Sequence, residues 1–267
     1  MISKTIRNFA VVCSLALLSV VSASAQSNSP AATANQGQAP APKLNPQEQA
    51  DYKTFFQTPD SDVDKKIQLG TAFTQKYPMS AYLVSVYDSL VQLYYAKQDW
   101  TNFYATGDKA LALNPDDVNT LVIVGWVIPH NYNPSDSDAE AKLARAEKYE
   151  KQALGLLGSM AKPANLSDAD FATMKAQATA QAHSGLGLVY FRRSNAADAV
   201  TELQQATSNN PMPDPSDLYV LGVELQQLKR NSEAADAFQK CSVITGPLQE
   251  RCKESADQAK KQPGAGR

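Results

Sequence analysis

Apolar and polar residues alternate along this chain with the period of amphipathic α-helices, and the pattern is clearest in residues 183–211. One face of a first helix carries the apolar or small residues Leu186, Gly187 and Tyr190. After a polar break, one face of a second helix carries Ala199, Leu203 and Ala206, and Pro211 ends it. We expect Gly187 to lie opposite Ala199, so that the backbones approach closely while Leu203 and Tyr190 fill the space beside them. The stretch therefore predicts a helical hairpin.

The same period, together with helix start and stop signals, divides residues 45–261 into about five helical hairpins. Asn45 is placed to cap the first helix, and Pro46 suits its first position. The last segment, 248–261, reads as a polar helix, which is typical of the cap that keeps the end of a repeat array soluble. The tail 262–267 contains Pro and Gly and is expected to be loose.

The middle of the chain departs from this regularity. The prolines in 129–134 cannot continue a helix and predict an enlarged turn. A long helix is expected over 137–160, and another over 167–193. We therefore expect an insertion around 129–180 between two more regular parts of the chain.

Corresponding apolar positions recur at a nearly constant step. They are Tyr87, Leu90, Val91 and Tyr94 in one unit and Leu121, Val124, Gly125 and Ile128 in the next. The last unit carries Leu218, Leu221, Gly222, Leu225, Ala234, Phe238 and Cys241. The step is 34 residues from Tyr87 to Leu121 and 35 residues from His183 to Leu218. This spacing resembles the tetratricopeptide repeat (TPR), a helix–turn–helix unit of 34 residues.

The resemblance implies an all-α solenoid of helical hairpins, wound as a right-handed superhelix and closed by a C-terminal capping helix. It also implies a concave groove lined by the first helix of each pair. The matching groove positions in this sequence are Asp88, Gln92, Tyr95, Val122, Trp126, Ser184, Leu188, Phe191, Tyr219, Val223 and Gln226. Tyr95, Trp126, Phe191 and Tyr219 are expected to form an aromatic line that anchors a protein or peptide. The alternative is that the turn at 129–140 or the long helices cover these rings as additional core.

The first 25 residues have the pattern of a secretory signal peptide. Lys4 and Arg7 form a positive start, 9–21 an apolar core that is short for a membrane span, and 23–25 a small-residue cleavage site. Residues 26–44, rich in Pro, Ala, Ser and Gln, are expected to be a disordered tether. The mature protein is therefore expected in the periplasm or outside the cell, without a membrane span; an uncleaved N-terminal anchor is the alternative.

Cys241 and Cys252 are the two cysteines that remain after removal of the signal peptide. A turn at Gly246 and Pro247 lets the chain reverse between them, and exported proteins form disulfides. We expect a bridge that pins the last helix. The alternative is that Cys241 simply occupies the small-residue position of its repeat. No Cys-x-x-Cys or His-x-x-x-His spacing indicates a metal site.

Charge and motifs argue against several functional classes. A formal net charge of −2 gives no concentrated basic surface, so nucleic acid is not an expected partner. His183 falls at a packing position of a helix, and His130 is expected to be solvated in the 129–134 turn. No nucleophile elbow and no Gly-rich phosphate loop is present, so neither a cofactor nor catalysis is expected.

The sequence predicts a non-catalytic module that binds a protein or peptide through a groove with aromatic anchors. Similarity to the TPR domains that clamp chaperone C-terminal carboxylates does not extend to this chain, because their Lys and Asn positions here hold Asp88, Gln92, Val122 and Trp126. The second hypothesis is a structural scaffold that uses its outer faces while the groove is filled. An enzyme is a distant third.

Overall fold

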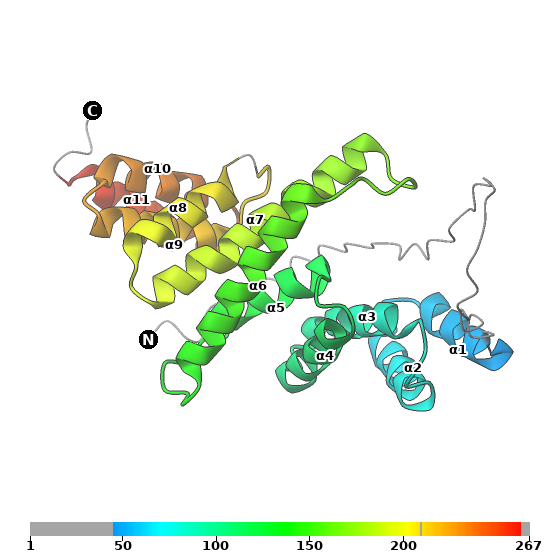
Figure 1. Cartoon of the computed structure of the whole chain (residues 1–267). Helices are drawn as coiled ribbons and strands as arrows, with labels where there is room; N and C mark the ends of the chain where they lie inside the picture. Colours follow the sequence, from blue (N-terminus) through cyan, green and yellow to red (C-terminus); the bar gives the residue numbers. More distant parts are fainter. Residues whose placement is uncertain (1–44, 209, 263–267) are drawn as a thin grey trace, which may run out of the picture. The chain divides into compact units, whose positions relative to one another are not determined.

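The computed structural model describes residues 45–208 and 210–262, which form eleven α-helices and no strand (Figure 1). The helices are α1 (Pro46–Gln57), α2 (Val63–Lys76), α3 (Leu83–Ala96), α4 (Trp100–Leu113), α5 (Val118–His130), α6 (Ala139–Ser159), α7 (Asp168–Arg192), α8 (Ala196–Thr207), α9 (Pro215–Gln227), α10 (Asn231–Ser242) and α11 (Gln249–Lys260). Helices that follow one another in the sequence pack in pairs. The predicted all-α fold of helical hairpins is confirmed, while the right-handed superhelix stays a prediction.

The described residues separate into two compact units, with the boundary between Ala110 and Leu111 in α4. In the N-terminal unit, Asn45 caps α1 as predicted, because its Oδ1 accepts the backbone N–H of Gln47 at 2.9 Å. Gly70 in α2 lets three helices approach. A Cβ at that position would lie 2.7 Å from Phe55 of α1 and 2.9 Å from Leu90 of α3.

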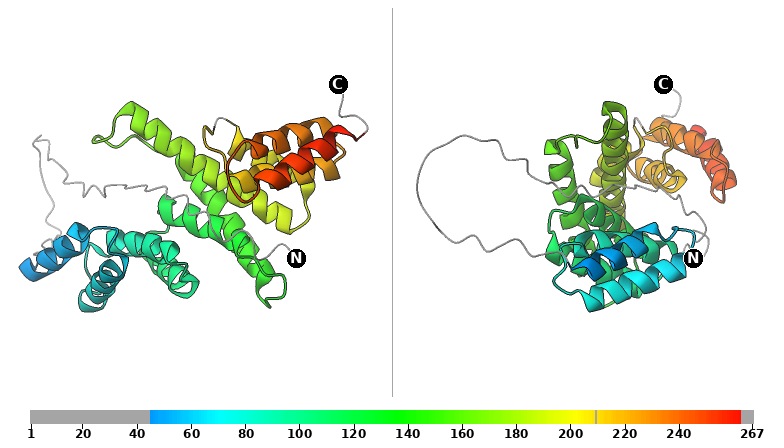
Figure 2. Two further views of the ribbon diagram at one scale, coloured as in Figure 1. Left: turned by 180° about the vertical axis from the view of Figure 1, so that it is seen from behind. Right: turned by 90° about the vertical axis from the view of Figure 1, so that its right-hand side faces the viewer.

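The C-terminal unit contains the hairpins α5–α6, α7–α8 and α9–α10, with α11 packed on α10. Both further views in Figure 2 show α6 and α7 lying side by side. The α7–α8 pair is the predicted hairpin of 183–211, but its closest contact differs from the expectation. The atoms nearest to a Cβ on Gly187 belong to Leu203, with Cγ at 2.6 Å, and not to Ala199. Gly222 of α9 packs on Phe238 of α10 in the same way, because a Cβ at Gly222 would lie 2.5 Å from Cε1 of Phe238.

The two long helices of the middle region, α6 and α7, have nearly the predicted bounds, but the turn that precedes α6 begins later than predicted. Ser167 caps α7, since its Oγ accepts the backbone N–H of Asp170 at 3.0 Å. The expectation that Pro129 starts the turn is wrong, because Pro129 lies inside α5, which ends at His130. The helical hydrogen bonds continue past this proline, since the N–H of Asn131, two residues later, bonds the Val127 carbonyl at 3.0 Å.

Cys241 of α10 and Cys252 of α11 form a disulfide, with their Cα atoms 5.7 Å apart. Both residues are fully buried and pack with Leu218 of α9. The bridge predicted from the sequence is therefore present. Cys241 also fills the buried small-residue position of its repeat, so this cysteine has both the disulfide and the packing role.

The predicted signal peptide (1–25) and tether (26–44) lie outside the described residues, as does most of the predicted tail (263–267). None of the helices in 45–208 and 210–262 combines the length and apolar character that a bilayer span requires.

Candidate functional site

Three first helices of the C-terminal unit are joined by a chain of side-chain hydrogen bonds. The indole Nε1–H of Trp126 in α5 donates to the Ser184 Oγ in α7 at 3.0 Å. The Ser184 hydroxyl in turn donates to Oδ1 of Asp217 in α9 at 2.9 Å. We call the surface over this chain the α5–α7–α9 face: half-buried Trp126, His130 and Phe191 form it, and buried Ser184 and Asp217 lie beneath it. Two of the predicted groove positions, Trp126 and Ser184, are thus brought together.

Asp217 at the end of this chain is 3% exposed. Burial, followed by the nearby charge of Asp214, raises the pKa of Asp217 well above its ordinary value, while the Ser184 hydrogen bond acts in the opposite direction. An ionised carboxylate is expensive to bury, so the hydroxyl of Ser184 is an important partner for this group. The chain therefore fixes the register of α5, α7 and α9 and places polar groups under the face.

His130 lies against the indole of Trp126, and the expectation that it is solvated is wrong. The two ring centroids are 3.9 Å apart, and Nδ1 of His130 lies 2.7 Å from the Trp126 carbonyl oxygen. A carbonyl only accepts, so Nδ1 carries the proton and Nε2 of the neutral ring is an acceptor. That Nε2 is out of contact with solvent and has no hydrogen-bond partner among the described residues. Burial lowers the pKa of His130 and keeps the ring neutral.

Phe191 lies beside a cationic and aromatic group at the C-terminal end of α7. The guanidinium of Arg192 is 5.4 Å from the Phe191 ring and 5.7 Å from the ring of Tyr132, which follows α5. Its Nε donates to the Pro129 carbonyl at 3.0 Å. Arg192 therefore ties the segment after α5 to the end of α7, and Phe191 keeps part of its surface exposed.

The other predicted groove residues are placed differently. Leu188 is 4% exposed, so it belongs to the core and does not line an open surface in this conformation. The centroid of the Tyr219 ring lies 5.6 Å from that of Phe238 in α10. The guanidinium of Arg251 in α11 lies 4.8 Å from the same Tyr219 ring. Half-buried Gln226 is also on α9, two turns after Tyr219.

Asp88, Gln92 and Tyr95 belong to the N-terminal unit. Tyr95 contacts the rings of Trp100 and Phe103 at 6.1 and 6.2 Å, which joins α3 to α4. Gln92 is exposed and Asp88 is half-buried on α3. A single aromatic line along all repeats stays a prediction.

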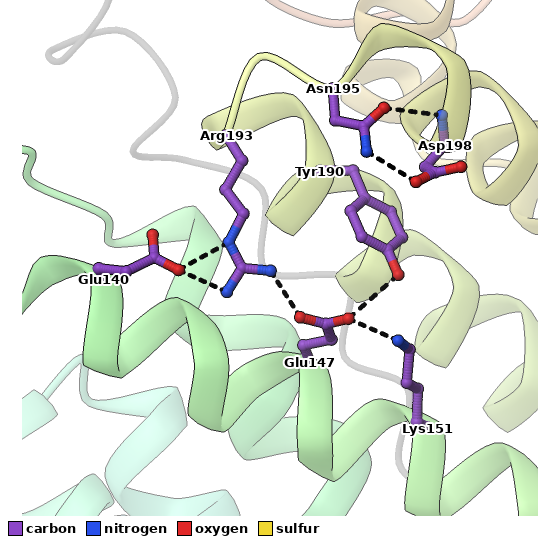
Figure 3. Close-up of polar contacts among 7 residues, drawn as sticks. All are labelled: Glu140, Glu147, Lys151, Tyr190, Arg193, Asn195 and Asp198. Carbon is purple, nitrogen blue, oxygen red and sulfur yellow. Dashed lines mark hydrogen bonds and ion pairs between the residues drawn. The ribbon is translucent and has the colours of Figure 1, made fainter.

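A second polar network holds α6 against the end of α7 (Figure 3). Glu147 of α6 accepts from Arg193 and Lys151, each at 2.5 Å, and from the Tyr190 hydroxyl at 3.2 Å. Arg193 also donates to Glu140 at 2.9 Å. The hydrogen bonds from Lys151 and Arg193 lower the pKa of Glu147 to about 2. A general acid near neutral pH needs a raised pKa, so this carboxylate acts as a clamp between helices.

The remaining histidine also has a structural partner. Nδ1 of His183 in α7 lies 2.6 Å from Oε2 of Glu202 in α8, and both side chains are largely buried. This contact agrees with the predicted packing role. Among residues 45–208 and 210–262, no three His, Cys, Asp or Glu side chains gather as a metal site would require.

Sequence reasoning missed His130, Asp217 and Arg192 as members or neighbours of the α5–α7–α9 face. His130 follows Trp126 by four residues and therefore lies on the same side of a helix, which is the signal that was available. The proline in between favoured a turn instead. Asp217 lies in the first turn of α9, where acidic residues are common, and only the structure shows that it is buried and bonded to Ser184.

Ser184→Ala is expected to lower the free energy of unfolding by about 2 kcal/mol, because it removes the hydroxyl that bonds the buried Asp217 carboxyl and accepts the Trp126 N–H. Urea unfolding followed by circular dichroism measures the change. Ser159→Ala is the control, since exposed Ser159 bonds a carbonyl of its own helix at 3.4 Å and its loss is expected to change stability by less than about 0.5 kcal/mol. Equal effects of the two substitutions would contradict the importance of the chain.

Comparison with solved structures finds proteins whose helices are arranged similarly, at low sequence identity. No protein-family model and no curated protein sequence matches the chain. A thermophilic TPR protein of Thermus thermophilus is 15% identical over 79% of this chain and 98% of its own, with a TM-score of 0.48. The MamA RS-1 ArsTM double mutant is also 15% identical, over 80% of this chain and 99% of its own, with a TM-score of 0.49. A TPR protein of Parabacteroides merdae is 14% identical over 81% of this chain and 86% of its own, with a TM-score of 0.38.

Proposed function

We propose that this protein is a non-catalytic interaction module that binds a protein or peptide through the α5–α7–α9 face. The observation that carries the proposal is the hydrogen-bonded chain from Trp126 through Ser184 to Asp217. It joins two positions that the repeat spacing assigned to a binding groove, Trp126 of α5 and Ser184 of α7, and links them to α9 through Asp217. The first helices of successive hairpins thus cooperate in one surface, as a repeat protein needs to grip an extended partner.

The residue types on this face suit protein recognition. Trp126 and Phe191 are half-buried, so each is held by its own helix and keeps apolar surface for a partner. Arg192 lies next to Phe191, and Trp, Tyr and Arg are the residue types most enriched at the centres of protein interfaces. Binding would remove apolar ring surface from water, while the buried polar chain below stays intact.

The polar groups of the unit support a non-catalytic function. Glu147 has a lowered pKa and is saturated by cations, and His183 is paired with Glu202. Asp217 has the raised pKa that a general acid needs, but it is buried beneath the face and bonded to Ser184. An active site needs titratable groups that converge on a reachable reacting atom.

We place the protein in an exported compartment, the periplasm or the exterior of the cell. Two observations support this: the signal-peptide pattern of residues 1–25 and the Cys241–Cys252 disulfide. Disulfides persist in oxidising compartments and are rare in the cytosol. Residues 26–44 would then act as a tether ahead of the repeat region at 45–261, and an uncleaved anchor remains the alternative arrangement.

A scaffold that uses its outer faces is the second candidate function, and two contacts favour it. The His130 ring covers part of Trp126, and Tyr132 lies over Arg192 next to Phe191. Leu188 is already core. In this alternative the segment after α5 fills the face, and partners bind elsewhere.

Purification of the protein with its partners from the native envelope fraction separates the two candidates. Trp126→Ala and Phe191→Ala are expected to lose the partner that the unchanged protein retains, with helicity by circular dichroism preserved. Phe171→Ala is the matched control, because it removes another half-buried phenylalanine of α7, about 30 Å along the helix axis. Lost helicity would identify the two aromatic residues as core and favour the scaffold. Unchanged capture by both variants would refute binding through this face.

A further inference from the structure

Glu150, in the middle of α6, is a fully buried carboxyl group between three helices. The residue is 0% exposed, and neither Oε1 nor Oε2 has a hydrogen-bond partner within the described part of the chain. Alanines at 146 and 153 lie on the same face of α6 and are equally buried. A charged carboxylate at such a position has nothing to compensate the loss of water.

The carboxyl group rests on the bare backbones of two glycines. A Cβ at Gly125 of α5 would lie 2.6 Å from Oε1 of Glu150. A Cβ at Gly185 of α7 would lie 2.8 Å from the Glu150 Cδ. No other residue type leaves room for this side chain, so Glu150 fills the space that both glycines open between α5 and α7.

The same two backbone segments carry the hydrogen bond of the α5–α7–α9 face. Gly125 directly precedes Trp126, and Gly185 directly follows Ser184. The distance between α5 and α7 is therefore set by Glu150 at one side and by the Trp126–Ser184 hydrogen bond at the other. Any change that pushes the two glycine backbones apart acts at once on the hydrogen bond next to them.

The charged and titratable groups close in sequence to Glu150, Gly125 and Gly185 are His130 in α5, His183, Tyr190 and Arg192 in α7, Arg193 directly after α7, and Arg145, Glu147, Lys148, Tyr149 and Lys151 in α6. His183 bonds Glu202, while Tyr190, Arg193 and Lys151 all bond Glu147. No charged group contributes to the pKa of Glu150; burial alone raises it well above its ordinary value of 4.5.

We propose that Glu150 is a proton-sensitive wedge that controls the α5–α7–α9 face. With the proton bound, the neutral carboxyl group fits between the glycines, and the Trp126–Ser184 hydrogen bond closes the face. When the proton is released to solvent, the carboxylate must gain water, α5 and α7 separate, and the indole of Trp126 is freed. This regulation acts on the binding surface of the proposed function and rests on it only for the effect on a partner.

The direction of the pH effect follows from the raised pKa. The folded state binds the Glu150 proton more tightly than the unfolded chain does, so the contribution of Glu150 to the stability of the closed face is fully present below pH 4.5. That stability declines as the pH rises toward the raised pKa of the buried group. The face is therefore expected to open on the alkaline side.

Fluorescence of Trp126 tests the proposal in the whole protein. The chain has two tryptophans, so Trp100→Phe makes Trp126 the single indole reporter. Raising the pH from 4.5 is expected to shift its emission to longer wavelength as the ring enters water, with far-UV circular dichroism largely retained. Adding Glu150→Gln, which stays neutral at every pH, is expected to abolish this shift. Glu150→Met gives the same expectation with an apolar side chain of similar size, if the amide variant folds poorly.

Glu147→Gln is the matched control, because it removes a carboxylate of the same helix that is paired with Arg193 and Lys151. It is expected to leave the Trp126 shift in place. An absent shift in the Trp100→Phe protein would overturn the proposal. An emission shift that persists in Glu150→Gln would show that another group, such as His130 or Asp217, causes it. That result would also overturn the proposal. The readout needs no partner, so a shift with these properties stands even if Phe191→Ala leaves partner capture unchanged.

Discussion

Gly187→Ala is expected to lower the free energy of unfolding by about 2 kcal/mol, although alanine is the better helix former. The added Cβ would lie 2.6 Å from Cγ of Leu203 and 3.3 Å from its backbone nitrogen. Leu203 is fully buried, so neither it nor the α8 backbone has room to move. Overpacking of this kind costs up to about 3 kcal/mol, and the higher helix propensity of alanine returns about 1 kcal/mol.

Gly155→Ala is the control for this prediction. Gly155 lies in α6 of the same unit, and a Cβ there would have no atom within 4 Å. The substitution is expected to stabilise the protein by about 1 kcal/mol through helix propensity alone. Urea unfolding of both variants by circular dichroism measures the difference. An equal change in the free energy of unfolding, in the same direction for both variants, would contradict the close packing of α7 on α8.

Loss of the Cys241–Cys252 disulfide is expected to destabilise the C-terminal unit by about 3 kcal/mol, from the loop entropy of the short segment it closes. The effect concentrates on α11, which is held to α10 by this bridge and by the buried residues Ala256 and Ala259. Hydrogen exchange of α11 amides and the thermal melt, each with and without reductant, measure the loss.

The double variant Cys241→Ala/Cys252→Ala controls for other effects of the reductant, because its melt is expected to be insensitive to it. Intact mass of the unchanged protein is expected to rise on reduction by the hydrogens that the two thiols regain. A melt and a mass that reductant leaves unchanged would contradict the bridge.

The helices were predictable because their signals are local. Ser167 ahead of an apolar period marked the start of α7, and Asn45 with Pro46 marked α1. The glycines of the hairpins were predictable as close contacts, since Gly187 and Gly222 recur at the repeat spacing. The partner of a glycine lies on another helix, so Leu203 was not distinguished from Ala199.

The details of the site depended on tertiary contacts that periodicity does not contain. Glu150 is one of many charged residues in α6, and only its burial against Gly125 and Gly185 shows that it is core. Pro129 suggested an early turn, which made His130 look solvated. The helical period placed Trp126 and Phe191 correctly on their helices, but it did not show that the His130 ring covers part of Trp126.

Site-specific photo-crosslinking tests the proposed binding face most directly. A photoreactive phenylalanine analogue replaces Phe191 in one protein and Phe171 in another, on the same helix about 30 Å apart. Both proteins are produced in the native cell and irradiated. A crosslinked partner at position 191 and none at position 171 is the result expected for binding through the α5–α7–α9 face. The same crosslinks at both positions, or a partner at position 171 alone, would contradict it.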